Sequence, residues 1–214
     1  MIRFVLFCLA ISFGVVTVDN PFEWQLKKYE NDIAIYAREV QGSGFKELKA
    51  VTSFHSNLSG LVAIVKDIPA TPDYVHHCKQ AYIVSSRGDS EITFYQETYV
   101  PWPMSNRDVV ILYKIKQDKR SKTVIIEAMG IQGIKPLVEG NVRIPELRGY
   151  WKFSLKKDGS VSGEYCLYLD PGSPIPDWLT NMFLIDGPFY TISKMKTLVT
   201  EKKYQDAKFQ NIVN

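Results

Sequence analysis

Few side chains in this sequence have the types and the spacing that metal or acid–base chemistry needs. The chain contains three histidines, and two of them stand in the run His76-His77-Cys78. No second group of Cys or His residues follows at the spacing of metal ligands, so we predict no metal site. Glu97, Tyr113 and Glu127 lie on predicted strands and are the candidates for acid–base work. No glycine-rich phosphate-binding motif occurs, and no cofactor is predicted.

Two arginines are available to pair with carboxylates on these strands. Arg107 stands next to Asp108 and opens a predicted strand after a turn with two prolines, and Arg143 lies further along the chain. A carboxylate that points into an apolar interior must be paired, so we expect Glu97 to pair with one of the two arginines. Two roles remain open for these side chains: a bridge between strands, or a polar anchor for a bound molecule.

The composition is that of a globular protein with a large apolar interior. Of 214 residues, 45% are hydrophobic, 23% are charged and 13% are aromatic, which excludes a disordered chain and a polytopic membrane protein. The net charge of +3 is too small to indicate nucleic-acid binding. Three cysteines are too few for a disulfide scaffold. We expect a monomer that binds no nucleic acid.

The N-terminus has the pattern of an export signal. Arg3 precedes an apolar run that is too short for a comfortable membrane span. We therefore predict a signal peptide over residues 1–19, a single domain over residues 20–214, and a secreted or periplasmic location. An uncleaved membrane anchor or a buried first strand is the alternative. The mature chain would keep Cys78 and Cys166, either bonded or as two buried thiols.

Alternation of polar and apolar residues predicts a sheet over most of the chain. A short helix is expected over residues 22–29, and a helix over residues 57–66, capped by Asn57, separates two early strands from the rest. Turn residues divide the remainder into short segments, which makes neighbouring strands antiparallel. The predicted strands are residues 32–38, 45–54, 81–86, 91–100, 108–117, 122–129, 149–155 and 161–169. In the strand over residues 108–117 the lysines at 114 and 116 should face water, so the predicted inward side chains are Val109, Ile111, Tyr113 and Ile115.

The last segment changes to a helical period. Between Pro176 and Lys203 apolar residues recur every three or four positions, and Gly187-Pro188 should kink this helix or split it in two. About eight or nine strands in one curved antiparallel sheet, with this helix laid against it, make an α+β fold. A strongly curved sheet leaves room beneath the helix, which either side chains or a ligand must fill.

Four short blocks of the chain agree in order and spacing with a known family. They are the run Pro101-Trp-Pro-Met-Ser-Asn-Arg-Asp108 and residues 24–38, 142–144 and 170–181. Together they resemble the START family of StAR-related lipid-transfer proteins over about residues 22–203, and the match is closest to its phosphatidylcholine-transfer branch. The resemblance implies the helix-grip fold, in which a curved sheet wraps a C-terminal helix over an apolar cavity of lipid size.

The resemblance does not extend to the residues that recognise choline. In the phosphatidylcholine branch an Arg–Asp ion pair and several aromatic rings hold phosphocholine. The positions of the ion pair are occupied here by Val75 and Lys79, and those of the rings by Gln96, Val109 and Leu147. A quaternary ammonium group would lose its cation–π partners at these positions.

These observations predict a non-catalytic protein that encloses one lipid or other hydrophobic small molecule under the C-terminal helix, with transient membrane contact. Two alternatives stay open: a helix-grip enzyme that acts on an apolar substrate through the acid–base candidates named above, and an interaction module with a filled core. The predicted ligand-binding residues are Glu97, Arg107, Val109, Ile111, Tyr113, Glu127, Arg143, Trp151, Trp178, Met182, Ile185 and Phe189.

Overall fold

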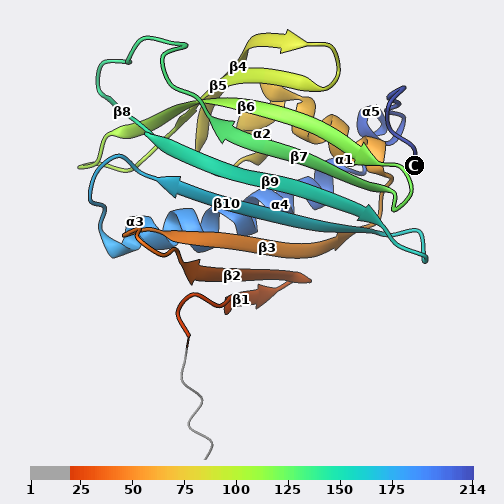
Figure 1. Cartoon of the computed structure of the whole chain (residues 1–214), viewed down its shortest axis with the longest axis horizontal. Coiled ribbons are helices and arrows are strands. Elements are labelled where there is room, and N and C mark those ends of the chain that lie inside the picture. Colours follow the sequence, from red (N-terminus) through yellow and green to blue (C-terminus); the bar gives the residue numbers. More distant parts are fainter. Residues whose placement is uncertain (1–19) are drawn as a thin grey trace, which may run out of the picture.

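One curved sheet of ten strands forms most of the protein (Figure 1). The computed structural model describes residues 20–214. Along the sheet the strand order is β1-β2-β3-β10-β9-β7-β6-β5-β4, and the short β8 pairs with β6. This last pair is parallel, whereas the other pairs are antiparallel. The strands are β1 (Gln25–Glu30), β2 (Ile33–Glu39), β3 (Lys46–Phe54), β4 (Cys78–Arg87), β5 (Glu91–Thr98), β6 (Asn106–Asp118), β7 (Thr123–Gly130), β8 (Asn141–Arg143), β9 (Glu146–Leu155) and β10 (Val161–Asp170).

The longest helices lie together on one face of the sheet, which curves around them (Figure 1). Asn57 caps the first helix as expected, because its side chain accepts a hydrogen bond from the Gly60 N–H at 2.7 Å. The helical segments are α1 (Leu58–Lys66), η1 (Ile68–Ala70), α2 (Thr71–Tyr74), α3 (Asp177–Asn181), η2 (Met182–Asp186), α4 (Gly187–Leu198) and α5 (Lys202–Gln205).

Alternating burial along the strands builds the core between the sheet and the helices. On β3, Leu48, Ala50, Thr52 and Phe54 are buried, while the residues between them remain partly accessible. On β6, Val109, Ile111 and Ile115 are buried as expected, but Val110 between them is buried as well. Ala50, Phe54 and the three expected residues of β6 pack in clusters with apolar residues of the helices, which include Leu58, Leu61, Ile64, Ile68, Ile192 and Met195. The hydrophobic effect therefore holds the helices against the sheet.

All eight predicted strands are present, and the predicted α+β class with a curved sheet and a C-terminal helix is confirmed. Residues 22–29, predicted as a helix, instead contribute strand β1. Its backbone pairs with the edge of β2, and this pairing outweighs the weak local preference for a helix. Strand β8 was not predicted, because three residues are too few to show an alternating pattern.

The predicted C-terminal helix is present but interrupted. A single π-helical turn, η2, lies between α3 and α4, and the Gly187 N–H donates to the Met182 carbonyl five residues back. Pro188 follows directly in the first turn of α4 and has no N–H to donate. The interruption therefore falls just before the Gly-Pro pair that predicted it.

The remaining expectations concern the two ends of the chain and the cysteines. The predicted signal peptide, residues 1–19, lies outside the described residues and stays a prediction. No helix among the described residues is long and apolar enough to cross a membrane. Cys78 and Cys166 are free thiols, so the two are not bonded to each other. The C-terminal tail packs against the domain, since Ile212 is buried and the Asn214 side chain accepts a hydrogen bond from the Ser59 N–H at 2.9 Å.

The first prediction concerns close packing within the sheet. A Cβ atom on Gly149 would lie 2.3 Å from the Cys166 carbonyl oxygen of the neighbouring strand, whereas one on Gly44 would meet no atom within 4 Å. We expect Gly149→Ala to lower the free energy of unfolding by about 1–3 kcal/mol, because backbone must move to admit the methyl group. Gly44→Ala should change it by less than about 0.5 kcal/mol. Urea denaturation compares the two variants, and equal stability would show that the sheet relaxes freely at Gly149.

Candidate functional site

A partly open cavity lies between the sheet and the segment that joins α2 to β4. This inner chamber has a volume of about 120 Å³. Strands β3, β5, β6, β7, β9 and β10 supply one wall, and α2, η2 and α4 supply the other. Its apolar lining includes Leu48, Val75, Val109, Ile111, Ile144, Leu147, Trp151, Leu167, Leu169, Met182 and Phe183.

A larger outer pocket adjoins the inner chamber. It has a volume of about 670 Å³ and lies where β3 begins, β10 ends and the chain turns into α3. Four side chains line both cavities, namely Leu48, Leu167, Leu169 and Phe183. Three of these project from strands, while Phe183 comes from the π-helical turn. The two cavities are therefore neighbours, and Phe183 stands between them on the helical side.

The polar groups of the inner chamber are uncharged hydroxyls, amides and imidazoles. No Asp, Glu, Lys or Arg among the described residues lines it. Burial raises the pKa of both the Tyr113 and the Tyr165 hydroxyls well above the ordinary value, so both remain protonated at neutral pH. Burial, and the neighbouring His77, lower the pKa of His76, which favours its neutral form. The chamber is thus polar at a few points without a permanent charge.

Five of the twelve predicted site residues line the inner chamber, and seven do not. The five are Val109, Ile111, Tyr113, Trp151 and Met182. Of the helix residues, Phe189 is buried in the main core, Ile185 is half-buried outside both cavities, and Trp178 is 45% exposed. The charged candidates, Glu97, Arg107, Glu127 and Arg143, make structural contacts outside the chamber.

The sequence did not indicate several of the lining residues. Thr71, His76 and His77 come from the irregular connection around α2, where no period marks which side chains face inward. His77 has a left-handed backbone, with φ of 59°, and nothing in the sequence indicates this conformation. Phe183 was part of the apolar helix stripe, but its position on a π-helical turn could not be read from that stripe.

Glu97 is a buried carboxylate that three neighbours neutralise. Its side chain is 4% exposed and accepts hydrogen bonds from Lys79 Nζ at 2.8 Å, Gln80 Nε2 at 2.6 Å and Asn106 Nδ2 at 2.8 Å. Burial alone would raise the pKa of Glu97, but these hydrogen bonds outweigh it and lower that pKa. The expected partners, Arg107 and Arg143, are replaced by Lys79, and Glu97 joins β4, β5 and β6 instead of facing the chamber.

Arg107 fixes the turn that leads into α3. Its guanidinium is 1% exposed and donates to the Ser105 carbonyl at 2.5 Å, to the Pro171 carbonyl at 3.4 Å and to Ser173 Oγ at 3.0 Å. Burial lowers the pKa of Arg107, and its carbonyl and hydroxyl partners satisfy the charge without a carboxylate. Of the two roles left open above, the structure shows the structural one.

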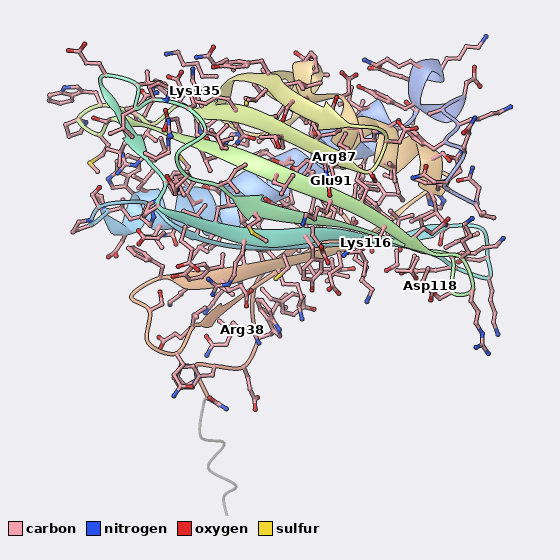
Figure 2. All side chains as sticks on the ribbon, turned by 45° about the horizontal axis from the view of Figure 1, so that its top comes forward. Arg38, Arg87, Glu91, Lys116, Asp118 and Lys135 are labelled. Atoms are coloured by element: carbon pink, nitrogen blue, oxygen red, sulfur yellow. The ribbon has the colours of Figure 1, made fainter. Side chains whose placement is uncertain are left out.

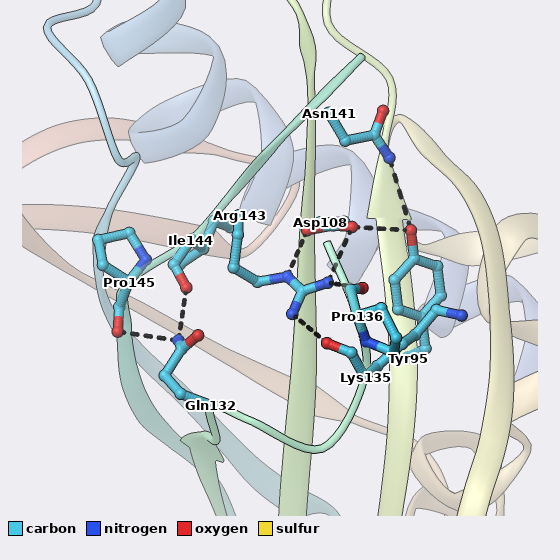
Figure 3. A network of polar contacts seen from close by, with 9 residues as sticks. All are labelled: Tyr95, Asp108, Gln132, Lys135, Pro136, Asn141, Arg143, Ile144 and Pro145. Atoms are coloured by element: carbon cyan, nitrogen blue, oxygen red, sulfur yellow. Dashed lines mark hydrogen bonds and ion pairs between the residues drawn. The ribbon is translucent and has the colours of Figure 1, made fainter. Parts of the chain in front are cut away.

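Arg143 and Asp108 form the second buried ion pair (Figure 3). Arg143 Nε donates to Asp108 Oδ1 at 2.5 Å and Nη2 donates to Oδ2 at 3.2 Å, with side chains 8% and 1% exposed. Arg143 also donates to the carbonyls of Lys135 and Pro136 at 3.2 Å, and Tyr95 donates to Asp108 at 3.0 Å. The hydrogen bond to Asp108 raises the pKa of Arg143. This network holds the long β7–β8 loop against β5 and β6.

Glu127 has no part in either cavity. Its side chain is 50% exposed and pairs with Lys116 at 3.3 Å. Lys116 lies on the face of the sheet away from the helices (Figure 2). Of the three acid–base candidates, only Tyr113 therefore reaches the chamber.

Four of the five positions compared above with the choline-recognising residues of the phosphatidylcholine branch line the inner chamber. Val75, Gln96, Val109 and Leu147 all line it, while Lys79 turns away to pair with Glu97. At these positions the chamber offers neither an ion pair nor an aromatic ring.

Comparisons with known proteins agree with this architecture. No family model matches the chain. The chain is 29% identical over 193 residues to an uncharacterized protein of Pseudomonas aeruginosa, which covers 90% of this chain and 95% of that protein. It is 26% identical over 172 residues to phosphatidylcholine transfer protein of Mus musculus, which covers 77% of this chain and 78% of the relative.

Solved structures give the same result. A STAR-related lipid transfer protein from Xanthomonas axonopodis matches with a TM-score of 0.76 at 25% identity, over 83% of this chain and 99% of that chain. Human StAR-related lipid transfer protein 5 shares the fold with a TM-score of 0.73 at 14% identity, over 82% and 86% of the two chains. The architecture is therefore the helix-grip fold. The chain is similar in sequence and fold to START-domain lipid-transfer proteins, as the four sequence blocks indicated.

The second prediction tests the structural role of the Arg143–Asp108 pair. We expect Arg143→Met to lower the free energy of unfolding by about 3–5 kcal/mol, because Asp108 is left buried without its counter-charge. Lys116→Met, which breaks the exposed pair with Glu127, should cost less than about 1 kcal/mol. Urea denaturation measures both. A normally stable Arg143→Met variant with altered ligand binding would assign Arg143 to a ligand instead.

Proposed function

We propose that this protein binds a single lipid or lipid-like hydrophobic molecule in its two adjoining cavities and carries it without chemical change. The observation that supports this most directly is the outer pocket beside the inner chamber, with a shared apolar wall. Transfer of apolar ligand surface out of water drives such binding, at roughly 25 cal/mol per Å². The related proteins of known name are lipid-transfer proteins, which supports the same conclusion.

The volumes favour a carrier over a protein with a filled core. Small-molecule sites usually measure about 300–1,000 Å³. The inner chamber, at about 120 Å³, is too small by itself, but the outer pocket of about 670 Å³ lies within that range. A ligand that occupies the outer pocket and extends into the inner chamber would use both.

The chamber is poorly equipped for catalysis. Glu97 and Glu127 are held in ion pairs elsewhere, and Tyr113 keeps a strongly raised pKa. An acid–base mechanism needs a group whose pKa lies near the working pH and a second group within reach of the same substrate atom. His76 and His77 also line the chamber, and no carboxylate among the described residues that line it orients them.

The end of the sheet that carries the outer pocket also carries exposed apolar side chains. Loops at this end present Trp102, 90% exposed, Leu137, 77% exposed, and Ile134, 53% exposed. Lys135, labelled in Figure 2, belongs to the same β7–β8 loop as Ile134 and Leu137. Tryptophan and neighbouring lysine are suited to the interface between water and lipid headgroups. We propose that this end touches a membrane while the ligand enters or leaves.

The third prediction tests ligand binding itself. Leu167 lines both cavities, so Leu167→Trp should fill their junction and reduce the bound lipid at least several-fold. Ile125→Trp places the same ring on a strand position that is 37% exposed and lines neither cavity, and it serves as the control. Both variants and the parent protein are delipidated, incubated with a membrane lipid extract, re-purified, and analysed by native mass spectrometry.

We expect one lipid per molecule in the parent protein and in the control. A parent protein that returns without lipid would contradict the proposed function. Equal loading of the Leu167→Trp variant at unchanged thermal stability would show that the ligand does not use these cavities.

The fourth prediction tests membrane contact. We expect Trp102→Ala combined with Leu137→Ala to slow lipid transfer between vesicles several-fold, because less apolar surface enters the bilayer. Lipid loading at equilibrium should stay unchanged, since neither side chain lines a cavity. Tyr29→Ala, which removes a ring that is 68% exposed on strand β1, is the control. Transfer is followed by loss of quenching of a fluorescent lipid, and an unaffected rate would place membrane contact elsewhere.

A further inference from the structure

We propose that the inner chamber receives a small uncharged polar group, a hydroxyl or a carbonyl, at one end of a neutral lipid whose hydrocarbon part lies in the outer pocket. This inference rests on the proposed function, because it names the class of lipid that the same cavities would select. It also separates this chain from the relatives named for phosphatidylcholine, whose ligand ends in a zwitterion.

The first step is size. A cavity of about 150 Å³ holds one benzene ring. The inner chamber, at about 120 Å³, is slightly smaller. A phosphocholine group is larger than benzene and also brings its water of hydration, so it exceeds this space. A hydroxyl or carbonyl with a few adjoining carbon atoms fits.

The second step is charge. A buried phosphate or ammonium group needs an opposite charge, since burial of an unpaired ion costs far more than a hydrogen bond returns. The described residues that line the chamber include no lysine, arginine or carboxylate. Two lysines outside the chamber already have partners, as Lys79 is paired with Glu97 and Lys194 Nζ donates to the Asp73 carbonyl at 2.9 Å. The charged residues of the outer pocket, Lys46, Asp170 and Asp177, do not line the inner chamber. A charged end would therefore be left unpaired.

The third step concerns cation–π binding, which ring–ring contacts restrict in the chamber. The Trp151 ring stacks on Tyr165 with centroids 4.1 Å apart and on Phe153 with centroids 5.8 Å apart. The Tyr113 ring meets the Phe94 ring at 4.7 Å. A quaternary ammonium group needs an open ring face. Here ring–ring contacts cover part of the Trp151, Tyr165 and Tyr113 rings, and no ring stands at Gln96, Val109 or Leu147.

The fourth step is the supply of hydrogen-bonding groups. Tyr113 and Tyr165 face the chamber with protonated hydroxyls. The Tyr113 oxygen accepts a hydrogen bond from the Trp151 indole N–H, which leaves the Tyr113 hydroxyl proton to donate. Thr71 also lines the chamber, and its buried Oγ1 has no hydrogen-bond partner among residues 20–214. A buried polar atom without a partner is costly, and a polar group of the ligand could supply one. These three hydroxyls therefore favour a ligand that ends in a hydroxyl or carbonyl over a pure hydrocarbon.

The last step is continuity between the two cavities. A ligand that spans them must pass Phe183, which lines both. Phe183 lies on the π-helical turn, whose i→i+5 hydrogen bonding makes it a weak point of the helix. We expect the Phe183 ring to turn aside when the ligand is bound.

The experiment uses three probes that share one chain: octane, 1-octanol and octylphosphocholine. Their binding is measured by displacement of N-phenyl-1-naphthylamine from the delipidated protein. In a cavity that cannot hydrogen-bond a hydroxyl, octane binds far more tightly than 1-octanol, because the hydroxyl loses its water without return. In the proposed chamber 1-octanol binds at least as tightly as octane, and both bind at least about tenfold more tightly than octylphosphocholine.

Variants that lack one hydroxyl locate the site. We expect Tyr113→Phe, Tyr165→Phe and Thr71→Val each to weaken 1-octanol binding by about 3- to 10-fold while leaving octane binding within about twofold. Tyr150→Phe is the matched control, since the Tyr150 hydroxyl donates to Glu164 at 2.6 Å and lines neither cavity. Its 1-octanol affinity should not change.

Each outcome decides the inference. Tighter binding of octane than of 1-octanol overturns it, and so does tightest binding of octylphosphocholine; in both cases a hydrophobic ligand still binds and the proposed function stands. If none of the three probes binds, the inference fails. The proposed function fails with it only if lipid extraction from the parent protein is also empty.

Discussion

The structure depends on a strongly curved sheet that cannot cover its own inner face. The ten-stranded sheet curves around α4. The apolar residues of every central strand must therefore find packing partners between the sheet and the helices. Toward α1 the partners suffice, and Phe54, Phe153 and Met195 pack into a solid core. Toward α3 the helical segment departs from regular packing at the π-helical turn, and the two cavities remain. The same geometry that requires a covering helix thus leaves the space in which a ligand would lie.

No charged side chain among the described residues lines the inner chamber, because the buried charged groups find partners at the strand ends. Glu97 is satisfied by Lys79, Asp108 by Arg143, and Arg107 by carbonyls of the turns before β6 and before α3. Each of these buried charges therefore joins segments that are distant in the sequence, and none of them faces the inner chamber. The charged residues Lys46, Asp170 and Asp177 line the outer pocket instead. The ion pairs shape the pocket end of the sheet, while the interior stays neutral.

Sequence patterns were informative where a period existed. Alternation predicted eight strands and the inward face of β6. A strand with one buried face requires apolar residues at every second position, and this period can be recognised in the sequence. It could not predict β1, an edge strand with both faces partly exposed, or β8, which is too short. The same limit applies to the site. Val109, Ile111 and Tyr113 lie on a periodic strand and were predicted to face the interior, whereas Thr71 and His76 lie on an irregular connection.

The charged residues show a different limit. Arg107 and Glu97 were candidate anchors because their types suit a polar ligand, yet residue type does not reveal which partner is nearest once the chain folds. The run Pro101–Asp108, which carries the family resemblance, supplies Arg107 and Asp108 to the contacts that hold the pocket end together. It therefore marks the scaffold. The side chains that meet a ligand come from other positions, so two chains can share this run and still select lipids with different polar ends.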